Sequence, residues 1–322
     1  MLQCRQTPYA RSGAETVPPS GALEASRAST FVISITPFTA SGGFDEAGIR
    51  RHLRRMATAG IGVYLGGGGS GEGYVLTSEE ARRLLEIGVE ELKGTVPVRA
   101  MGCEPRTAAE MIEYVAVAKR AGVEATQIYS LDPGHGHRPN RQEMQAYFED
   151  VLSAIELPAV LSTHQSVGYR VPVEMLVGFA ERYEHLIGIN CTHQDTTYLA
   201  EIVDALGDRL DIHVGGPQQA LVAWSLGATG YLSSEANFSP ELCMDVVRAY
   251  REGDAAALSS SFGKLLRLFA ALYGAGGIRA TKGVLDRLGF AGGVPRKPQL
   301  PISADVIDRL VALIRQLGVI PV

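Results

Sequence analysis

The stretch LIGINCTHQD, residues 186–195, is a short apolar run that ends in a cluster of polar residues. A run of this kind predicts a buried parallel strand that leads into a loop and then a helix. In an α/β barrel, the active site is built at such strand ends. Asn190 lies at the end of this run. An asparagine amide is not a usable nucleophile toward a carbonyl, so a covalent imine with a substrate cannot form at residue 190.

Similar apolar runs recur along the chain and alternate with longer amphipathic stretches. The predicted strands are Phe31–Ile35, Gly62–Leu65, Pro97–Ala100, Thr126–Tyr129, Pro158–Leu161, Leu186–Ile189, Asp211–Val214 and Gly230–Leu232. The predicted helices between them are Asp45–Ala59, Ser78–Leu92, Ala108–Ala121, Gln142–Ile155, Pro172–Arg182, Thr196–Leu206, Gln218–Leu226 and Pro240–Arg251. Eight such units predict a parallel sheet with right-handed crossovers, closed into a (β/α)8 TIM barrel.

The alternative fold is a doubly wound open sheet, which needs a topological switch point. No GxGxxG follows the first predicted strand, and the eight units are evenly spread, so the barrel is favoured. We expect residues 31–252 to form it. Residues 1–30 are rich in Pro, Ser, Ala and Gly and predict a flexible arm, unless the true start lies further downstream. Residues 253–322 predict a C-terminal helical region, with helices at Ala255–Leu272, Ile278–Leu288 and Ala304–Leu317.

The composition is that of an ordinary soluble protein, with a net charge of −5 and no basic stripe that would indicate nucleic acid as a partner. Cys4, Cys103, Cys191 and Cys243 are far apart and form no CxxC pair. This spacing argues against a disulfide framework or a zinc knuckle and favours a reducing, cytoplasmic compartment. We expect no membrane-spanning segment and no secretory signal, because the sequence offers no suitable uninterrupted apolar run.

A glycine-rich loop, GGGGSGEG at residues 66–73, follows the second predicted strand. Glycines let backbone N–H groups approach a ligand and bind an anion, although the same residues can simply form a tight turn. The loop is followed by a capping box at Thr77–Glu80. Together these segments resemble the GxxGEG loop of the dihydrodipicolinate synthase and N-acetylneuraminate lyase family. Further similar segments at 35–38, 157–161, 186–189, 226–230 and 236–237 extend the resemblance over roughly residues 31–316.

This resemblance implies a (β/α)8 barrel with a C-terminal helical domain, usually in a homotetramer. It also implies aldol-type cleavage or condensation of 2-oxo acids through a lysine imine. The imine lysine of the family falls on Asn190, and its proton-shuttling tyrosine falls on Ser162. Of the two hydroxyl residues in the glycine loop, one is Gly69 and only Ser70 remains. The fold is therefore expected to carry over, while the imine mechanism is not.

Other departures concern residues around the expected site. No tyrosine of the family's fourth-strand loop is present in residues 132–137, and Arg170 lies near the expected carboxylate-binding arginine without matching it. Lys282 matches a helix position outside the family's catalytic set. Glu72 is expected to anchor the glycine loop.

Histidines cluster at the predicted strand ends. His135 and His137 follow the fourth strand, His164 the fifth and His193 the sixth, while Glu235 follows the eighth. Three interpretations are open. His164, His193 and Glu235 could transfer protons, since histidine titrates near neutrality. Some of these side chains could hold a divalent metal, or they could lie on a solvated rim. The spacing fits no known metal motif, so we predict no cofactor, with a divalent metal as the weaker alternative.

Polar residues at the same strand ends complete the predicted site. We expect Ser70 and Asn190 to join the three proton-transfer candidates in catalysis, with Asn190 holding a carboxylate or an oxyanion, or only filling space. The predicted substrate-binding residues are Gly69, Ser70, Ser162, Thr163, Gly215 and Ser234. Because side chains alternate along a strand, an inward Asn190 places Cys191 toward the helices, which favours a buried structural thiol.

The sequence thus predicts a divergent lyase that acts on a small oxo acid or hydroxy acid without a lysine imine, by acid–base or metal-assisted chemistry. The alternative is a catalytically inactive family member that binds a small carboxylate ligand or regulates a partner. We expect a homo-oligomer, a dimer or a tetramer, that binds neither nucleic acid nor membrane.

Overall fold

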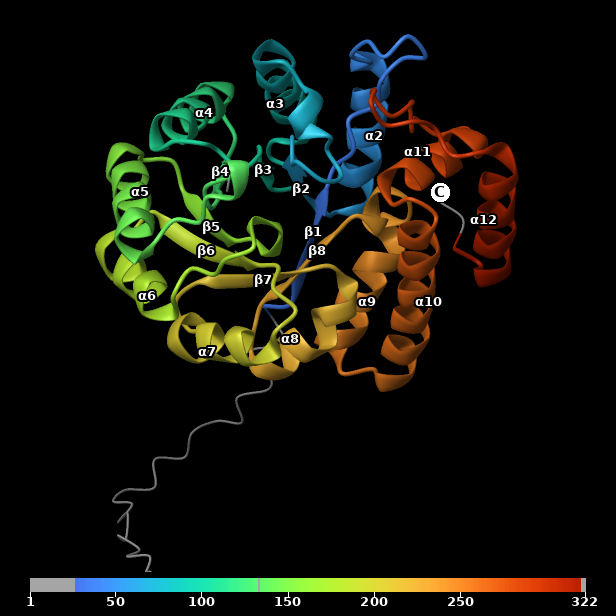
Figure 1. The fold of residues 1–322 in the computed structure, drawn as a ribbon. Helices are drawn as coiled ribbons and strands as arrows, with labels where there is room; N and C mark the ends of the chain where they lie inside the picture. Colours follow the sequence, from blue (N-terminus) through green and yellow to red (C-terminus); the bar gives the residue numbers. More distant parts are fainter. Residues whose placement is uncertain (1–26, 133, 320–322) are drawn as a thin grey trace, which may run out of the picture.

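The computed structural model describes residues 27–132 and 134–319 and contains a closed barrel of eight parallel strands (Figure 1). The strands are β1 Ser29–Ile33, β2 Gly62–Leu65, β3 Val98–Ala100, β4 Ala125–Ile128, β5 Ala159–Thr163, β6 Leu186–Cys191, β7 Asp211–Gly215 and β8 Gly230–Ser233. Each strand pairs with the next along the chain, and β8 closes the barrel against β1. The predicted (β/α)8 barrel is confirmed.

Eight helices surround the barrel (Figure 1). They are α2 Glu46–Ala59, α3 Ser78–Leu92, α4 Ala108–Ala121, α5 Arg141–Ala154, α6 Val173–Arg182, α7 Thr196–Leu206, α8 Ala220–Leu226 and α9 Pro240–Glu252. Short 3₁₀ helices follow several strands: η1 Gly73–Val75, η2 Gly134–Gly136, η3 Gln165–Val167, η4 Pro217–Gln219 and η5 Glu235–Asn237. The predicted helix at 218–226 begins within η4, because Pro217 fixes a 3₁₀ turn before the α-helix.

The barrel has two apolar layers. Outward side chains of the strands pack against the helices in one large core, which includes Ile189 and Cys191. A second cluster fills the barrel interior with Phe31, Tyr64, Met101, Tyr129 and Leu232. A filled interior leaves the carboxyl ends of the strands as the place where a ligand can bind.

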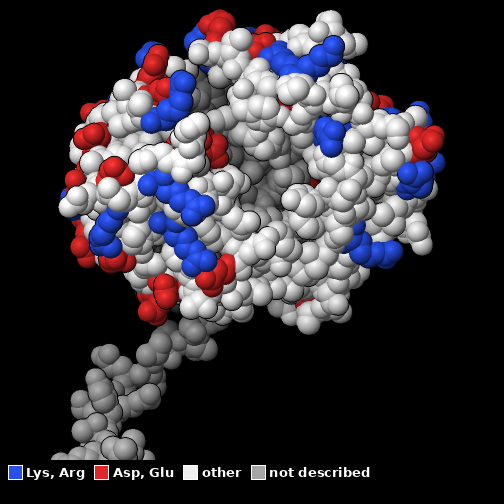
Figure 2. Space-filling view, viewed as in Figure 1, with Lys and Arg blue, Asp and Glu red and all other residues white. Residues whose placement is uncertain are grey.

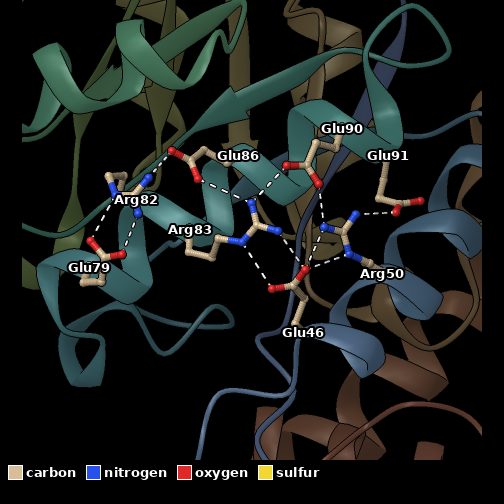
Figure 3. A network of polar contacts seen from close by, with 8 residues as sticks. All are labelled: Glu46, Arg50, Glu79, Arg82, Arg83, Glu86, Glu90 and Glu91. Atoms are coloured by element: carbon tan, nitrogen blue, oxygen red, sulfur yellow. Dashed lines mark hydrogen bonds and ion pairs between the residues drawn. The ribbon is translucent and has the colours of Figure 1, made fainter.

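The helices α2 and α3 are tied together by a network of arginines and glutamates (Figure 3). Arg50 contacts Glu46 on its own helix at 2.7 Å and Glu91 on α3 at 2.7 Å. Arg83 of α3 contacts Glu46 at 2.7 Å and Glu90 at 2.9 Å. Single exposed pairs contribute little to stability, but shared partners fix the two helices relative to one another and so support the loop between them.

Three further helices follow the barrel: α10 Ala255–Gly274, α11 Ile278–Arg287 and α12 Ala304–Leu317. They lie together on one side of the barrel, beside α9 (Figure 1). Gly276 and Gly277 connect α10 to α11 with φ values of 118° and 60°, a conformation that side chains with a Cβ rarely adopt. This tight turn brings the end of α10 and the start of α11 over the barrel.

The predicted segment boundaries shift slightly. The first strand begins at Ser29, before the expected barrel start at residue 31. The arm predicted for residues 1–30 lies almost entirely outside the described residues. Among the described residues, α10 is long and apolar enough to cross a membrane by length and composition alone, with a mean hydropathy of 1.2; a core helix passes the same test, so this finding does not contradict the expectation of no membrane-spanning segment. Its buried leucines, Leu265, Leu268 and Leu272, belong to the protein core.

Candidate functional site

A cavity of about 660 Å³ opens at the carboxyl ends of the strands, as Figure 2 shows. The strand ends and loops contribute Ile33, Gly69, Ser70, His164, Gln165, Ser166, Thr192, Gln194, Gly215, Gly216, Gln218, Leu232, Ser234 and Glu235. The C-terminal helices contribute Phe269, Leu272, Tyr273, Gly277, Ile278 and Thr281. The cavity therefore lies between the barrel and the helical region, where ligands of this fold bind.

The glycine-rich loop reaches the cavity because its chain folds tightly on itself. A Cβ on Gly73 would lie 2.1 Å from the carbonyl oxygen of Gly66, so no larger residue fits there. Ser70 shares a hydrogen bond of 2.7 Å with Ser234, which joins the loop to the end of β8. Within the described chain, the N–H groups of Gly69 and Ser70 have no acceptor. Two free N–H groups and two hydroxyls form a site suited to a carboxylate or an oxyanion.

A buried ion pair holds this loop in place. Glu72 has a φ of 51°, which is unfavourable for a residue with a side chain, and it forms an ion pair with Lys282 of α11. Both side chains are fully buried. Lys282 also donates to the carbonyl oxygens of Thr36 at 2.9 Å and Val294 at 3.1 Å. Glu72 therefore anchors the loop, and Lys282 is held away from the cavity.

Among the described residues that line the cavity, Glu235 is the one carboxylic acid. Its side chain is buried, and burial raises its pKa to about 6. Ser233 donates a hydrogen bond of 3.2 Å to its Oε2. A carboxyl group that titrates near neutrality can both accept and release a proton under ordinary conditions.

His164 lies on the wall of the same cavity, between two other side chains. Its Nδ1 is 2.9 Å from Oε1 of Glu104, although the two groups are not aligned as a directional hydrogen bond. The ring also contacts Tyr129 edge-on, with centroids 5.7 Å apart. Burial is the largest single influence on Glu104 and raises its pKa, but His164 and a backbone hydrogen bond together outweigh it, so the pKa is lowered. These contacts fix the ring and leave Nε2 for a ligand.

Asn190 points into the barrel, as expected, but lies outside the cavity lining. Its Nδ2 donates to Oε1 of Gln127 at 2.5 Å and lies 3.5 Å from the hydroxyl of Tyr64. Its side chain is fully buried, and its Oδ1 has no partner. The structure therefore places this amide in the packed barrel interior, where it cannot meet a ligand without displacing other side chains.

The remaining predicted residues divide between the two faces of the sheet. Gly69, Gly215 and Ser234 line the cavity with Ser70. Ser162 faces the interior beside Asn190 and has an unpartnered hydroxyl.

Two predicted residues, Thr163 at the end of β5 and His193 in the loop after β6, pack against α7. Thr163 shares a hydrogen bond of 3.0 Å with Tyr198 of α7, and His193 packs edge-on against the same ring. Burial, together with the charges of Arg170 and His164, lowers the pKa of His193. Neither residue lines the cavity, which argues against the predictions that His193 transfers protons and that Thr163 binds substrate.

Other sequence candidates also lie away from the cavity. Burial raises the pKa of the Cys191 thiol to about 11, in keeping with an inert structural cysteine. Arg170 contacts Asp195 at 2.8 Å rather than the cavity. His135 and His137 are exposed on the loop after β4. Among residues 27–132 and 134–319, no group of three His, Cys, Asp or Glu side chains is arranged to hold a metal ion.

Three features of the site were missed from the sequence. Glu104 follows β3 and meets His164 from β5 only after the barrel closes. The wall formed by α10 and α11 depends on how those helices dock. The Glu72 and Lys282 pair joins residues far apart in the chain. Of these three features, only the ion pair had a signal in the sequence: the glycine-rich loop predicts that Glu72 anchors it, although not that Lys282 is its partner.

Comparison with known proteins supports the fold described above. The family model described as "Dihydrodipicolinate synthetase family" matches residues 26–317. The 4-hydroxy-tetrahydrodipicolinate synthase of Methanopyrus kandleri is 28% identical over 289 residues, which cover 89% of this chain and 95% of the relative. A probable 5-dehydro-4-deoxyglucarate dehydratase of an Arthrobacter species is 28% identical over 287 residues, which cover 87% of this chain and 92% of the relative.

A solved structure has the same fold. The prophage protein YagE of E. coli K12, of the dihydrodipicolinic acid synthase family and crystallised with pyruvate, superposes with a TM-score of 0.82 at 22% identity, covering 91% of this chain and 99% of that one. Together with the family match over most of the sequence, this fold places the protein: the chain belongs to the dihydrodipicolinate synthetase family.

Proposed function

We propose that this protein is a lyase-type enzyme that acts on a small 2-oxo or 2-hydroxy acid by proton transfer, without a lysine imine. One observation carries the proposal. A single cavity is lined by the glycine-rich loop at Gly69 and Ser70 and by a carboxylic acid, Glu235, whose pKa is raised to about 6, while none of the described residues that line it is a lysine.

The cavity suggests a role for each group. The substrate carboxylate binds the N–H groups of Gly69 and Ser70 and the hydroxyls of Ser70 and Ser234. With a 2-oxo acid, Glu235, mostly ionised at pH 7, takes a proton from C3, the carbon next to the oxo group. His164, held by Glu104, exchanges a proton with the substrate oxygen through Nε2. This division of roles gives an enol or enolate intermediate with no covalent bond to the protein.

The placement of the amines supports a reaction without an imine. Lys282 is engaged with Glu72 and two carbonyl groups, so its amine is not free to attack a ketone. Asn190, which the resemblance aligns with the imine lysine, has its amide bound to Gln127.

The relatives support the reaction class in a general way. The relatives include a synthase and a probable dehydratase, and a structural neighbour was crystallised with pyruvate. We extend oxo-acid chemistry to this chain on that basis. We also infer that the protein is a cytoplasmic homo-oligomer, a dimer or a tetramer. Light scattering coupled to size-exclusion chromatography tests the oligomer, and a single monomeric species would contradict it.

Hydrogen exchange at carbon tests the proposal directly. In D₂O, the protein should catalyse deuterium incorporation at the methyl group of pyruvate or at C3 of a longer 2-oxo acid, followed by proton NMR. Glu235→Gln should remove this exchange, whereas Glu252→Gln, at an exposed carboxylate at the end of α9, should not. If a broad panel of 2-oxo and 2-hydroxy acids shows neither exchange nor turnover, the protein is a binding member of the family and the proposal fails.

A further inference from the structure

The charges around the cavity are unevenly distributed. Figure 2 shows walls drawn mostly in white, with the charged side chains gathered on the surrounding rim. None of the described lining residues is lysine or arginine, while Glu235 is a lining acid and Glu104 stands behind His164. Arg170, near the loop after β5, is paired with Asp195, and Arg279 of α11 follows the lining residue Ile278 in sequence but is not itself a lining residue. The cavity thus offers hydrogen bonds for one carboxylate and negative charge beyond it.

The wall opposite the strand ends is apolar. Phe269 and Tyr273, one turn apart on α10, stack with ring centroids 5.5 Å apart and an angle of 17° between the rings. Leu272 and Ile278 continue this surface along α10 and α11. Tyr273 is 72% exposed, so the stacked pair offers a free aromatic edge at the mouth. Aromatic surfaces of this kind bind apolar groups.

We propose that the substrate is a monocarboxylate whose distal end is uncharged and apolar, and that this end packs against Phe269 and Tyr273. The inference rests on the proposed function for the position of the substrate carboxylate, at Gly69 and Ser70. A second carboxylate would lie near Glu235, and none of the described residues that line the cavity is a lysine or arginine that would offset its charge. Like charges brought together in a partly buried site are repelled. The cavity therefore disfavours dicarboxylates through charge repulsion. It favours substrates with an apolar tail, which packs against the aromatic wall.

A matched pair of ligands tests the charge. Calorimetric titration at pH 7.5 compares 2-oxoglutarate with its 5-methyl ester, which has the same chain length but no distal charge. The ester should bind at least about tenfold more tightly. Gln194→Arg, which adds a cation at an exposed lining position, should raise the affinity for 2-oxoglutarate. The same charge at Gln142→Arg, on the outer helix α5, should not. Equal or tighter binding of 2-oxoglutarate by the unaltered protein overturns the inference.

A second pair tests the apolar wall. Phe269→Ala should weaken binding of 2-oxo-4-phenylbutanoate more than binding of pyruvate. Phe262→Ala, on the same helix but outside the cavity lining, should leave the ratio of the two affinities unchanged. A ratio that does not respond to Phe269→Ala, or the absence of binding by all these monocarboxylates, overturns the inference. Selective binding without deuterium exchange would instead refute the proposed catalysis and leave the binding preference intact.

Discussion

Replacing Glu235 by glutamine should make the protein more stable and less active at the same pH. Burial raises the pKa of Glu235 from its ordinary value of 4.5 to about 6. This rise corresponds to roughly 2 kcal/mol. Because the pKa is higher in the folded state, the favourable contribution is fully present below pH 4.5 and is lost as the pH rises through 6. Glutamine keeps the neutral form at every pH.

The expected result has two parts. At pH 8, Glu235→Gln should raise the free energy of unfolding by about 2 kcal/mol, or the midpoint of thermal unfolding by roughly 3 °C, with no gain at pH 4. Oxo-acid exchange should fall by about 10²- to 10⁴-fold, as expected for loss of a general base. In the unaltered protein, exchange should increase about tenfold per pH unit up to pH 6 and then level off.

Denaturant unfolding followed by circular dichroism measures the stability, and proton NMR in D₂O measures the exchange. Glu252→Gln serves as the control and should change neither quantity, since that carboxylate is exposed. If Glu235→Gln is destabilising at pH 8, or if the exchange rate does not change near pH 6, then Glu235 does not titrate in a buried site and its role as base is refuted.

Two other residues give separate tests. Lys282→Met should lower the free energy of unfolding by about 3–5 kcal/mol, because it leaves Glu72 buried without its cation. Adding Glu72→Gln should recover part of this loss. A loss under about 1 kcal/mol in the single variant would contradict a buried ion pair. His164→Gln should lower the rate of deuterium exchange into the 2-oxo acid by about 10²-fold or more without changing stability strongly. The control His137→Gln, at an exposed histidine, should leave this rate unchanged. Equal exchange rates in the two variants would exclude a catalytic role for His164.

The sequence predicts the barrel well because its signals are local. Each strand is a short apolar run, and each helix has a regular apolar face, so their order alone leads to a closed sheet. The same alternation that places Asn190 inward and Cys191 outward also decides the neighbouring positions. On β5, Thr163 points outward and bonds to Tyr198. His193, two residues after Cys191, packs against the same ring.

The rest of the site depends on contacts between distant parts of the chain. Glu104 is an ordinary acidic residue in the sequence, and only closure of the barrel brings it to His164. Asn190 is at the expected strand end, but the packing of Gln127 and Tyr64 around it removes it from the cavity. The apolar wall follows from the docking of α10, which no local pattern specifies.

Borohydride trapping tests the central claim most directly, namely proton transfer in this cavity without a lysine imine. The protein is incubated with pyruvate or another 2-oxo acid that exchanges in D₂O, reduced with sodium borohydride, and measured by intact-mass spectrometry. We expect the unmodified mass together with catalysed exchange. A stable reduced adduct, mapped by peptide sequencing to any lysine, would contradict the account, because it would show that an amine reaches the bound ketone.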